Sequence, residues 1–313
     1  MWSIRYIKDL YIFDNRNMER YMQQRKRILF VINPISGGKK KTAFNKQVLE
    51  VLDLEKFDPT FKITNHANHA YELGQLAVKE GYDAVIAVGG DGTINELGSA
   101  ILGTGMPLGI IPEGSGNGLA LYLGIPLNES AAIRRINRFE TVEVDTGEIN
   151  GRSFFNMAGL GFDASVSDHF ANESIRGPIG YLRSAINVLG KFKPSHYTLI
   201  IDGRRFEKEA FMISVANSPQ YGNHAYIAPQ ASINDGILDV CIVDRFPLYL
   251  LPKMIFHLFT KSADQSDYVE IIPGKEITII RKDKGPVHID GEPVEMGLEL
   301  NIGIQHKSLK IIC

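Results

Sequence analysis

The sequence has little cysteine, no long hydrophobic run and almost no net charge, and each of these shortages excludes a class of protein. Cys241 and Cys313 are its only cysteines, too few and too late in the chain for a disulfide framework, so we expect a reducing compartment, the cytoplasm. No apolar run reaches the roughly 18 residues of a transmembrane helix. The formal net charge of −2 gives no reason to expect a nucleic-acid partner.

The rest of the composition is that of an ordinary globular protein. Hydrophobic residues make up 44% of the 313 residues and charged residues 22%, which is enough to bury a sizeable core, and this length is typical of two domains. Residues 1–25 mix aromatic and charged side chains without a clear period and lack the apolar core of a signal peptide. We treat them as an N-terminal extension without an assigned function.

Apolar runs of strand length alternate with helical spacing between residues 26 and 142. This alternation predicts an α/β domain with a parallel sheet and helices on both faces. The expected strands are residues 28–32, 61–64, 83–88 and 108–111, and the expected helices are residues 42–52, 70–79 and one that carries Ile94, Leu97 and Ile101.

Residues 143–304 show alternating runs separated by turn residues, which predicts an antiparallel, β-rich second domain. The expected strands are 141–148, 153–157, 197–201, 206–215, 238–243, 276–281 and 287–289, with one helix at 179–189. A strand near residues 305–313 is a candidate to return to the first domain. The longest apolar-leaning stretch is Pro247–Phe259, interrupted by Lys253 and His257. It predicts either a buried helix, which we favour, or a helix on a membrane surface.

Three turns in the first domain are rich in glycine, and each follows an apolar strand and opens toward a helix. They are Asn33–Gly38, Gly89–Asn95 and Gly114–Asn117. In a parallel sheet such turns gather at the carboxyl edge, where ligands bind, and a backbone without Cβ atoms brings N–H groups against phosphate oxygens. The hydroxyls of Ser36, Thr93 and Ser115 are small enough to donate to the same oxygens. The alternative for any single turn is a capped helix entry.

The turn at residues 89–96 also carries a carboxylate at its apex. Asp91 beside phosphate oxygens makes sense if a divalent cation lies between them. The chain contains no Gly-x-x-x-x-Gly-Lys-Ser/Thr sequence, and no Gly-x-Gly-x-x-Gly closes the first strand. These absences exclude a P-loop enzyme and weaken a dinucleotide interpretation.

Taken together, the motifs resemble the diacylglycerol kinase catalytic domain, which bacterial soluble lipid kinases share with sphingosine and ceramide kinases. The resemblance runs in family order from about residue 26 to the end of the chain. It is carried by Asn33-Pro-Ile-Ser-Gly37, Gly89–Glu96, Gly114-Ser-Gly-Asn117, Gly159-Leu-Gly-Phe-Asp163, Ile233–Leu238 and Asp290-Gly-Glu292.

The resemblance implies an N-terminal three-layer α/β domain like that of NAD kinase and phosphofructokinase, a C-terminal antiparallel β-sandwich, and an active site in the cleft between them. It implies that ATP binds at the glycine turns and at the end of the second strand. By motif position, the nucleotide contacts fall on Asn33, Pro34, Ser36, Gly37, Thr64, Gly89, Gly90, Asp91, Gly92, Thr93, Ile94, Asn95, Gly114, Ser115 and Asn117.

For the chemistry, the resemblance assigns Glu292 as the acceptor of the substrate proton. Asp290 would orient Glu292 or hold a metal, and Asp91 would bind the Mg²⁺ that bridges the ATP phosphates. The roles of Asp91 and Glu292 could be exchanged, because sphingosine kinases credit the aspartate of the glycine turn with base chemistry. From the residues alone, a hairpin turn with an exposed glutamate is the favoured interpretation of Asp290-Gly-Glu292, and the family pattern reverses this preference.

Two further sites follow from the resemblance. A structural Mg²⁺ would be held by the Asp235 carboxylate and the carbonyls of Ser232 and Ile237, although an Asn-Asp-Gly hairpin turn needs no ion. Asp163 would meet the polar end of the lipid, or would cap a helix.

The implied function is an ATP- and Mg²⁺-dependent lipid kinase that phosphorylates diacylglycerol or a related lipid. The alternatives are a kinase of the same fold with a soluble acceptor such as NAD, and a non-catalytic nucleotide or lipid sensor. We expect transient contact with the inner face of the membrane through Pro247–Phe259 or the basic clusters Arg25–Arg27 and Arg281–Lys284, and we expect a homodimer.

Overall fold

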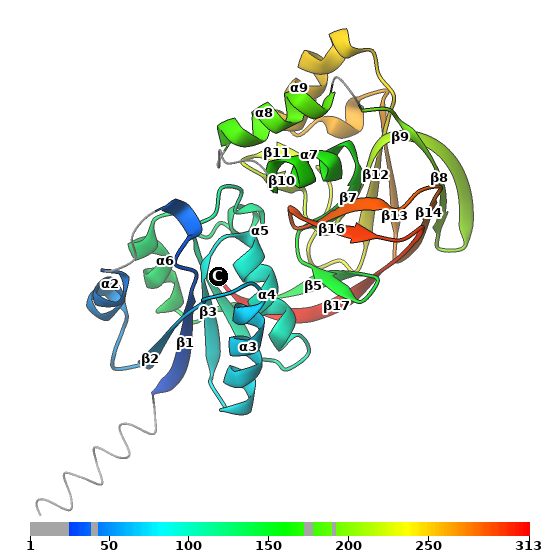
Figure 1. Cartoon of the computed structure of the whole chain (residues 1–313). Coiled ribbons are helices and arrows are strands. Elements are labelled where there is room, and N and C mark those ends of the chain that lie inside the picture. Colours follow the sequence, from blue (N-terminus) through cyan, green and yellow to red (C-terminus); the bar gives the residue numbers. More distant parts are fainter. Residues whose placement is uncertain (1–24, 39–42, 172–177, 190–191) are drawn as a thin grey trace, which may run out of the picture.

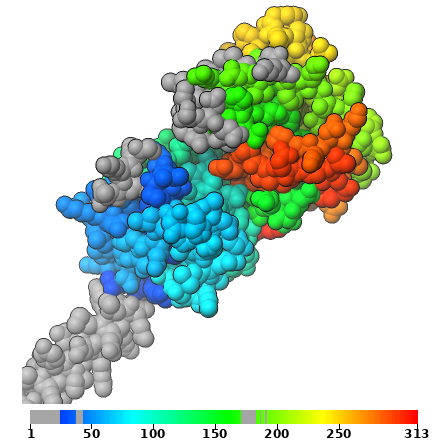
Figure 2. All heavy atoms as spheres, viewed as in Figure 1, coloured from blue at the N-terminus to red at the C-terminus, as the bar shows by residue number. Residues whose placement is uncertain are grey.

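The computed structural model describes residues 25–38, 43–171, 178–189 and 192–313, which form two domains side by side (Figures 1 and 2). The expected N-terminal extension lies outside the described residues except for Arg25. Within the described residues, no helix is long and apolar enough to cross a membrane.

The first domain is the predicted α/β unit. Its parallel strands pair in the order β2-β1-β3-β4, and β1 and β3 are buried almost throughout because helices cover both faces of the sheet. Helices α3 and α4 pack together on one side, and α2 and α6 on the other (Figure 1). The elements are β1 (Lys26–Ile32), η1 (Ser36–Gly38), α2 (Phe44–Val51), β2 (Phe57–Ile63), α3 (His69–Lys79), β3 (Ala84–Gly89), α4 (Asp91–Ile101), β4 (Pro107–Pro112), α5 (Gly118–Tyr122) and α6 (Glu129–Ile136).

Strand β2 is longer than predicted and contains Pro59. It is an edge strand that pairs only with β1, so the missing N–H of the proline costs little there. The short helices α5 and α6 were not predicted from the sequence.

The second domain is the predicted antiparallel sandwich. Its strands are β6 (Arg152–Phe154), β7 (Met157–Gly161), β8 (Ser195–Ile201), β9 (Arg204–Ala216), β10 (Gln220–Gly222), β11 (Ala225–Tyr226), β12 (Leu238–Asp244), β13 (Val269–Gly274), β14 (Glu276–Arg281), β15 (Gly285–Ile289) and β16 (Glu292–Met296). Its helical segments are α7 (Phe162–Ala171), α8 (Pro178–Leu189), η2 (Leu248–Leu250), α9 (Leu251–Phe259) and η3 (Ala263–Gln265).

The expected single strand at 153–157 is wrong. The chain forms β6 and β7 with a break at Phe155 and Asn156. At this break three consecutive backbone N–H groups donate to the carboxylate of Asp290 and not to a neighbouring strand. They belong to Phe155, Asn156 and Met157.

Two long strands join the domains. Strand β5 (Thr141–Ile149) runs antiparallel to β17 (Glu299–Ile312), and the end of β17 lies parallel to β4, with Lys310 opposite Pro107. The end of the chain therefore lies in the sheet of the first domain. The predicted boundaries at 142/143 and 304/305 fall inside these two strands, which belong to both domains.

The interpretation of Pro247–Phe259 as a buried helix is wrong. In the described structure Met254 is the buried residue of α9, whereas Phe256 is 62% and Phe259 56% exposed. The helix lies on the surface at the end of the second domain away from the α/β domain, drawn in gold in Figures 1 and 2.

Candidate active site

The three glycine-rich turns meet at the carboxyl edge of the parallel sheet. The first turn contacts the second through Asn33, whose Nδ2 donates to Oγ1 of the buried Thr93 at 3.0 Å. The first turn also contacts the third, because a Cβ on Gly37 would lie 3.0 Å from the carbonyl oxygen of Glu113. Gly37 has a φ of 68°, which favours glycine.

The second and third turns touch through their backbones. A Cβ on Gly114 would lie 2.7 Å from Cα of Gly90, so this approach requires glycine. Gly90 is the N-cap residue of α4 and provides no side-chain cap for the eleven-residue helix. The first-turn N–H groups of α4, at the positive end of its dipole, therefore suit an anionic group such as phosphate.

The third turn is closed by Asn117, which the sequence interpretation assigned to nucleotide binding. Its Oδ1 accepts from Gly114 N at 2.8 Å and its Nδ2 donates to Gly114 O at 2.7 Å. The side chain is buried and both of its amide atoms hold the turn, and the nucleotide contact of Asn117 stays a prediction. Ser115 is exposed and keeps its hydroxyl available.

Asp91 connects the second turn to the third. Its Oδ2 accepts from Asn117 N at 2.9 Å and its Oδ1 from Gly118 N at 3.1 Å. Burial, followed by the negative charge of Asp290, raises the pKa of Asp91 to about 6, and the two amide bonds only partly offset this. A divalent cation bound beside the carboxylate would offset both the burial and the charge of Asp290.

Asp290 is half-buried and joins the two domains. Its Oδ1 accepts from Asn156 N and Met157 N at 2.8 and 3.1 Å, and its Oδ2 accepts from Phe155 N and Asn95 Nδ2 at 2.9 and 2.8 Å. Burial raises the pKa of Asp290, while these four donors oppose the shift. Each carboxylate oxygen already accepts two hydrogen bonds, so the structure does not support Asp290 as a metal ligand.

Asn95 was also expected to contact the nucleotide, and here the structure differs. Its Nδ2 donates to Ser153 O at 2.9 Å in addition to Asp290. Asn95 thus ties α4 of the first domain to β6 and the Asp290 turn of the second. Ile94 is 2% exposed and packs in the core, so only its backbone is available at the turn.

Glu292 faces the Gly89–Glu96 turn across the domain interface. It begins β16, two residues after Asp290, and is exposed. A Cβ on Gly92 would lie 3.0 Å from Glu292 Oε1. The anchored Asp290 and the left-handed Asp290-Gly291 turn therefore set the position of the glutamate beside the N-terminus of α4.

The remaining nucleotide candidates lie at the same edge of the sheet. Thr64 directly follows β2, and its N–H donates to Ile32 O at the end of β1. Ser36 Oγ donates to Asn33 O at 3.0 Å, and Pro34 is exposed between them.

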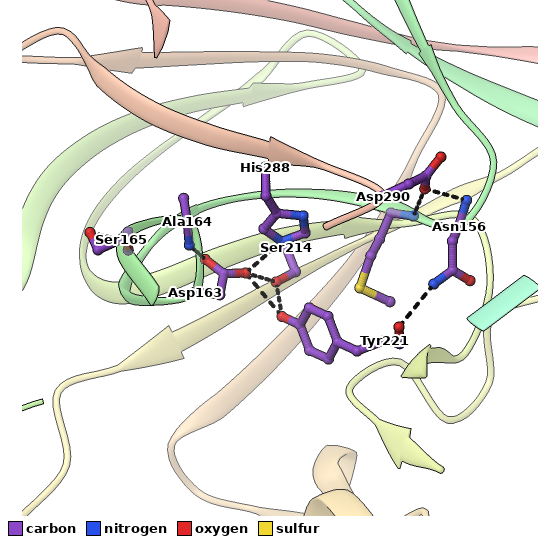
Figure 3. A network of polar contacts seen from close by, with 10 residues as sticks. Asn156, Asp163, Ala164, Ser165, Ser214, Tyr221, His288 and Asp290 are labelled. Atoms are coloured by element: carbon purple, nitrogen blue, oxygen red, sulfur yellow. Dashed lines mark hydrogen bonds and ion pairs between the residues drawn. The ribbon is translucent and has the colours of Figure 1, made fainter. Parts of the chain in front are cut away.

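Asp163 is a buried residue in a polar network (Figure 3). Its Oδ2 accepts from Ser214 Oγ and Tyr221 Oη, both at 3.1 Å, and lies 3.0 Å from His288 Nε2. Its Oδ1 accepts from Ala164 N at the start of α7. With 6% exposure, the carboxylate holds structure together, and the expected direct contact with the lipid is not supported.

The glycines of the Gly159–Asp163 motif make room for this network. A Cβ on Gly159 would lie 2.4 Å from both Asp163 Oδ2 and His288 Nε2. Gly161 has a φ of 94°, and its Cβ would lie 2.7 Å from Phe211 O. Sequence reasoning missed Ser214, Tyr221 and His288. The sequence offered one indication of the role of His288. It lies two residues before Asp290, on the strand that leads into the site.

A cavity of about 560 Å³ lies between α7 and α8. It is lined by Ser165, His169, Asn187, Val188 and Phe192. Ser165 and Asp163 both belong to α7, so this helix contributes to the cavity and to the buried network. Its volume is within the range of small-molecule pockets.

The loop of the expected structural ion is shaped by a residue that the sequence did not reveal. The buried carboxylate of Asp145 accepts from Gly236 N at 2.6 Å and from Lys307 N at 2.7 Å, and lies 2.8 Å from His306 Nδ1. Asp235 is exposed, and its Oδ1 accepts from Ile237 N at 3.1 Å. This is the geometry of a turn, and the second Mg²⁺ site with Ser232 stays a prediction.

Comparison with known proteins agrees with this architecture. Residues 27–149 match the diacylglycerol kinase catalytic domain, and residues 156–313 match the YegS C-terminal NAD kinase beta sandwich-like domain. A diacylglycerol kinase of Bacillus subtilis (strain 168) is 27% identical over 273 residues, covering 85% of this chain and 90% of that protein. A Klebsiella pneumoniae (strain 342) protein named "Probable lipid kinase YegS-like" is 28% identical over 264 residues, covering 81% and 87%.

A solved structure of a diacylglycerol kinase from Bacillus anthracis str. Sterne has the same fold, with a TM-score of 0.69 at 20% identity over 92% of this chain and 96% of that chain. A catalytic α/β domain followed by a sandwich of the NAD kinase type defines a two-domain phosphotransferase. The chain belongs to the family of lipid kinases that combine the diacylglycerol kinase catalytic domain with the YegS C-terminal domain.

Proposed function

We propose that the chain transfers the γ-phosphoryl group of ATP to a hydroxyl of diacylglycerol or a related lipid, with Mg²⁺ as the metal. The observation that carries this proposal is the uncapped N-terminus of α4, which lies among three touching glycine turns and is faced by Glu292 from the other domain. The lipid acceptor follows from the family, whose B. subtilis member is named diacylglycerol kinase. The homodimer stays a prediction.

The residues at the glycine turns fit ATP and Mg²⁺. Gly90 and Gly114 leave the backbone without Cβ atoms where phosphate would approach, and Ser115 offers an exposed hydroxyl. We place the adenosine near Thr64, which directly follows β2 at the same edge of the sheet. Asp91 would hold the ion, directly or through water, because its carboxylate lies in the first turn of α4 and bonds the third glycine turn, beside the backbone that suits phosphate. Bound Mg²⁺ would neutralise charge on the phosphates during transfer.

In this mechanism Glu292 accepts the proton of the lipid hydroxyl as its oxygen attacks the γ-phosphorus. The bond between the γ-phosphorus and the bridging oxygen breaks, and ADP leaves. Asp290 does not touch the reacting atoms; its four hydrogen bonds fix the turn that presents Glu292. We place the apolar part of the lipid in the cavity between α7 and α8.

The test of the function is a labelled-ATP assay of the purified protein against a total lipid extract, with the product identified by mass spectrometry. We expect a phosphorylated lipid whose formation requires Mg²⁺. A parallel reaction with NAD distinguishes the soluble acceptor. Phosphorylation of NAD alone, or calorimetric ATP binding without any product, would replace the proposal by one of the two alternatives.

The pKa of Asp91 gives the expected pH dependence. Because this pKa is raised to about 6, the folded chain holds the proton more tightly than the unfolded chain does, and the metal-free protein loses stability as pH rises toward about 6. Mg²⁺ competes with this proton. We therefore expect kcat/KM to fall below about pH 6 and the acid limb to move to lower pH as Mg²⁺ is raised.

The measurement is a pH profile of kcat/KM at limiting and at saturating Mg²⁺. The matched control is Asp91→Asn, in which the Mg²⁺-dependent displacement of the limb should disappear. A limb that stays at the same pH at every Mg²⁺ concentration would remove Asp91 from the metal site.

A further inference from the structure

The end of the second domain carries a cluster of exposed, large apolar side chains, which we call the α9 surface. Its members are Leu248 (60% exposed), Tyr249 (79%), Ile255 (44%), Phe256 (62%) and Phe259 (56%). They come from η2 and α9, which follow each other in the chain and pack together. Contiguous apolar side chains of this size on a surface mark a site of interaction.

Helix α9 is apolar on two faces. Met254 and Leu258, four positions apart, pack into the core beneath the helix. Ile255, Phe256 and Phe259 project on the other side, where a helix at a protein surface ordinarily carries polar residues. The core contact therefore accounts for only one of the two apolar faces.

Within residues 245–263, which contain the α9 surface, the charges have one sign, whereas Asp264 and Asp267, just beyond this segment, are acidic and exposed. From Arg245 to Ala263 the sequence contains no aspartate or glutamate, and Arg245, Lys253 and Lys261 are all exposed. The whole chain has a net charge of −2, so this excess of positive charge is local. Apolar side chains with basic residues in the same segment, Lys253 within the helix itself, complement a lipid surface with anionic headgroups.

We propose that the α9 surface docks the protein on a bilayer that contains anionic lipid, with the apolar side chains inserted and the basic residues among the headgroups. The proposal rests on the proposed function, because a lipid kinase must reach a substrate that resides in a membrane. It replaces the broader expectation of membrane contact by one defined surface.

The β10–β11 hairpin connects the α9 surface with the active site. On one side Lys261 Nζ lies 4.5 Å from the centroid of the Tyr226 ring, which ends β11. On the other side Tyr221, in β10, donates to the buried Asp163, and a Cβ on Gly222 would lie 2.9 Å from Gly116 O in the third glycine turn. One hairpin therefore contacts the docking helix, the buried network and the nucleotide site.

The first experiment is co-sedimentation with vesicles of phosphatidylcholine, with and without phosphatidylglycerol. We expect the wild-type protein to bind the anionic vesicles and to dissociate as salt is raised. The double variant Phe256→Ser/Phe259→Ser should bind at least about tenfold more weakly, since two large side chains no longer insert. Lys253→Glu should weaken binding to anionic vesicles and leave the weak binding to neutral vesicles unchanged.

The matched control is Leu127→Ser. Leu127 is 54% exposed, close to the 56% of Phe259, but precedes α6 in the α/β domain. This variant should bind vesicles like the wild type. Both serine variants should melt at the wild-type temperature, because their side chains contribute little to the core.

Activity separates docking from catalysis. On long-chain diacylglycerol in anionic vesicles the double variant should lose at least about tenfold in rate, following its weaker binding. On water-dispersed dioctanoylglycerol it should match the wild type. The docking proposal would be overturned if the wild-type protein did not bind anionic vesicles, or if the double variant bound them equally well.

If the wild-type protein were a dimer and the double variant a monomer, the α9 surface would instead bind a second copy of the chain. Vesicle binding without phosphorylation of any lipid would overturn the proposed function and leave the docking surface in place.

Discussion

Replacing Glu292 by Gln is expected to lower kcat by about 10²–10⁴-fold, the range for loss of a general base. The glutamine keeps the size of the side chain beside Gly92 but cannot accept the proton of the lipid hydroxyl. Because Glu292 is exposed and its carboxylate is not part of the buried interface, the variant should fold and bind ATP like the wild type. Steady-state kinetics with dispersed dioctanoylglycerol and a calorimetric ATP titration measure both properties.

Glu295→Gln is the matched control. Glu295 is an exposed glutamate on the same strand, three residues further along, and its loss should leave kcat within about twofold of wild type. Comparison of Glu292→Gln with Asp91→Asn shows which acid is the base and which binds the metal. Loss of the metal ligand should raise the Mg²⁺ concentration needed for activity, whereas loss of the base should not. A wild-type rate in Glu292→Gln would transfer the base role to Asp91.

The sequence was sufficient for the layout of the α/β domain because local patterns determine it. Buried parallel strands are uniformly apolar, as in β3, and each glycine turn lies directly after its strand. Helix α3 follows the predicted residues 70–79 to within one position. The meeting of the three turns also follows from sequence, since parallel strands bring their carboxyl ends to one edge.

The roles of the polar site residues could not be read in the same way, because their partners are distant in the chain. Asp290 contacts groups 133 to 195 residues away, and these contacts decide that it binds four N–H groups and not a metal. The break between β6 and β7 has the same cause. Asn95 and Asn117 sit in nucleotide-binding motifs, yet their amides are used to close the site.

The prediction that α9 is buried was wrong for a different reason. An apolar stretch shows that side chains avoid water but does not show what covers them, so a core helix and a docking helix have similar sequences. Phe256 and Phe259 become distinguishable from Met254 only when the neighbouring elements are in place.

Asp290→Ala is expected to lower the free energy of unfolding by about 3–4 kcal/mol, because it leaves four N–H donors at the domain interface without their acceptor. The turn that presents Glu292 then loses its anchor, so kcat should fall as well. The matched control is Asp202→Ala: Asp202 also lies at positive φ before a glycine and accepts two backbone N–H groups at 3.0 Å, but it is exposed. Water can replace its carboxylate, so the urea unfolding curve should move much less and kcat should not change. Equal losses of stability in the two variants would mean that Asp290 acts only as a turn residue, and that the position of Glu292 is fixed by the rest of the sandwich.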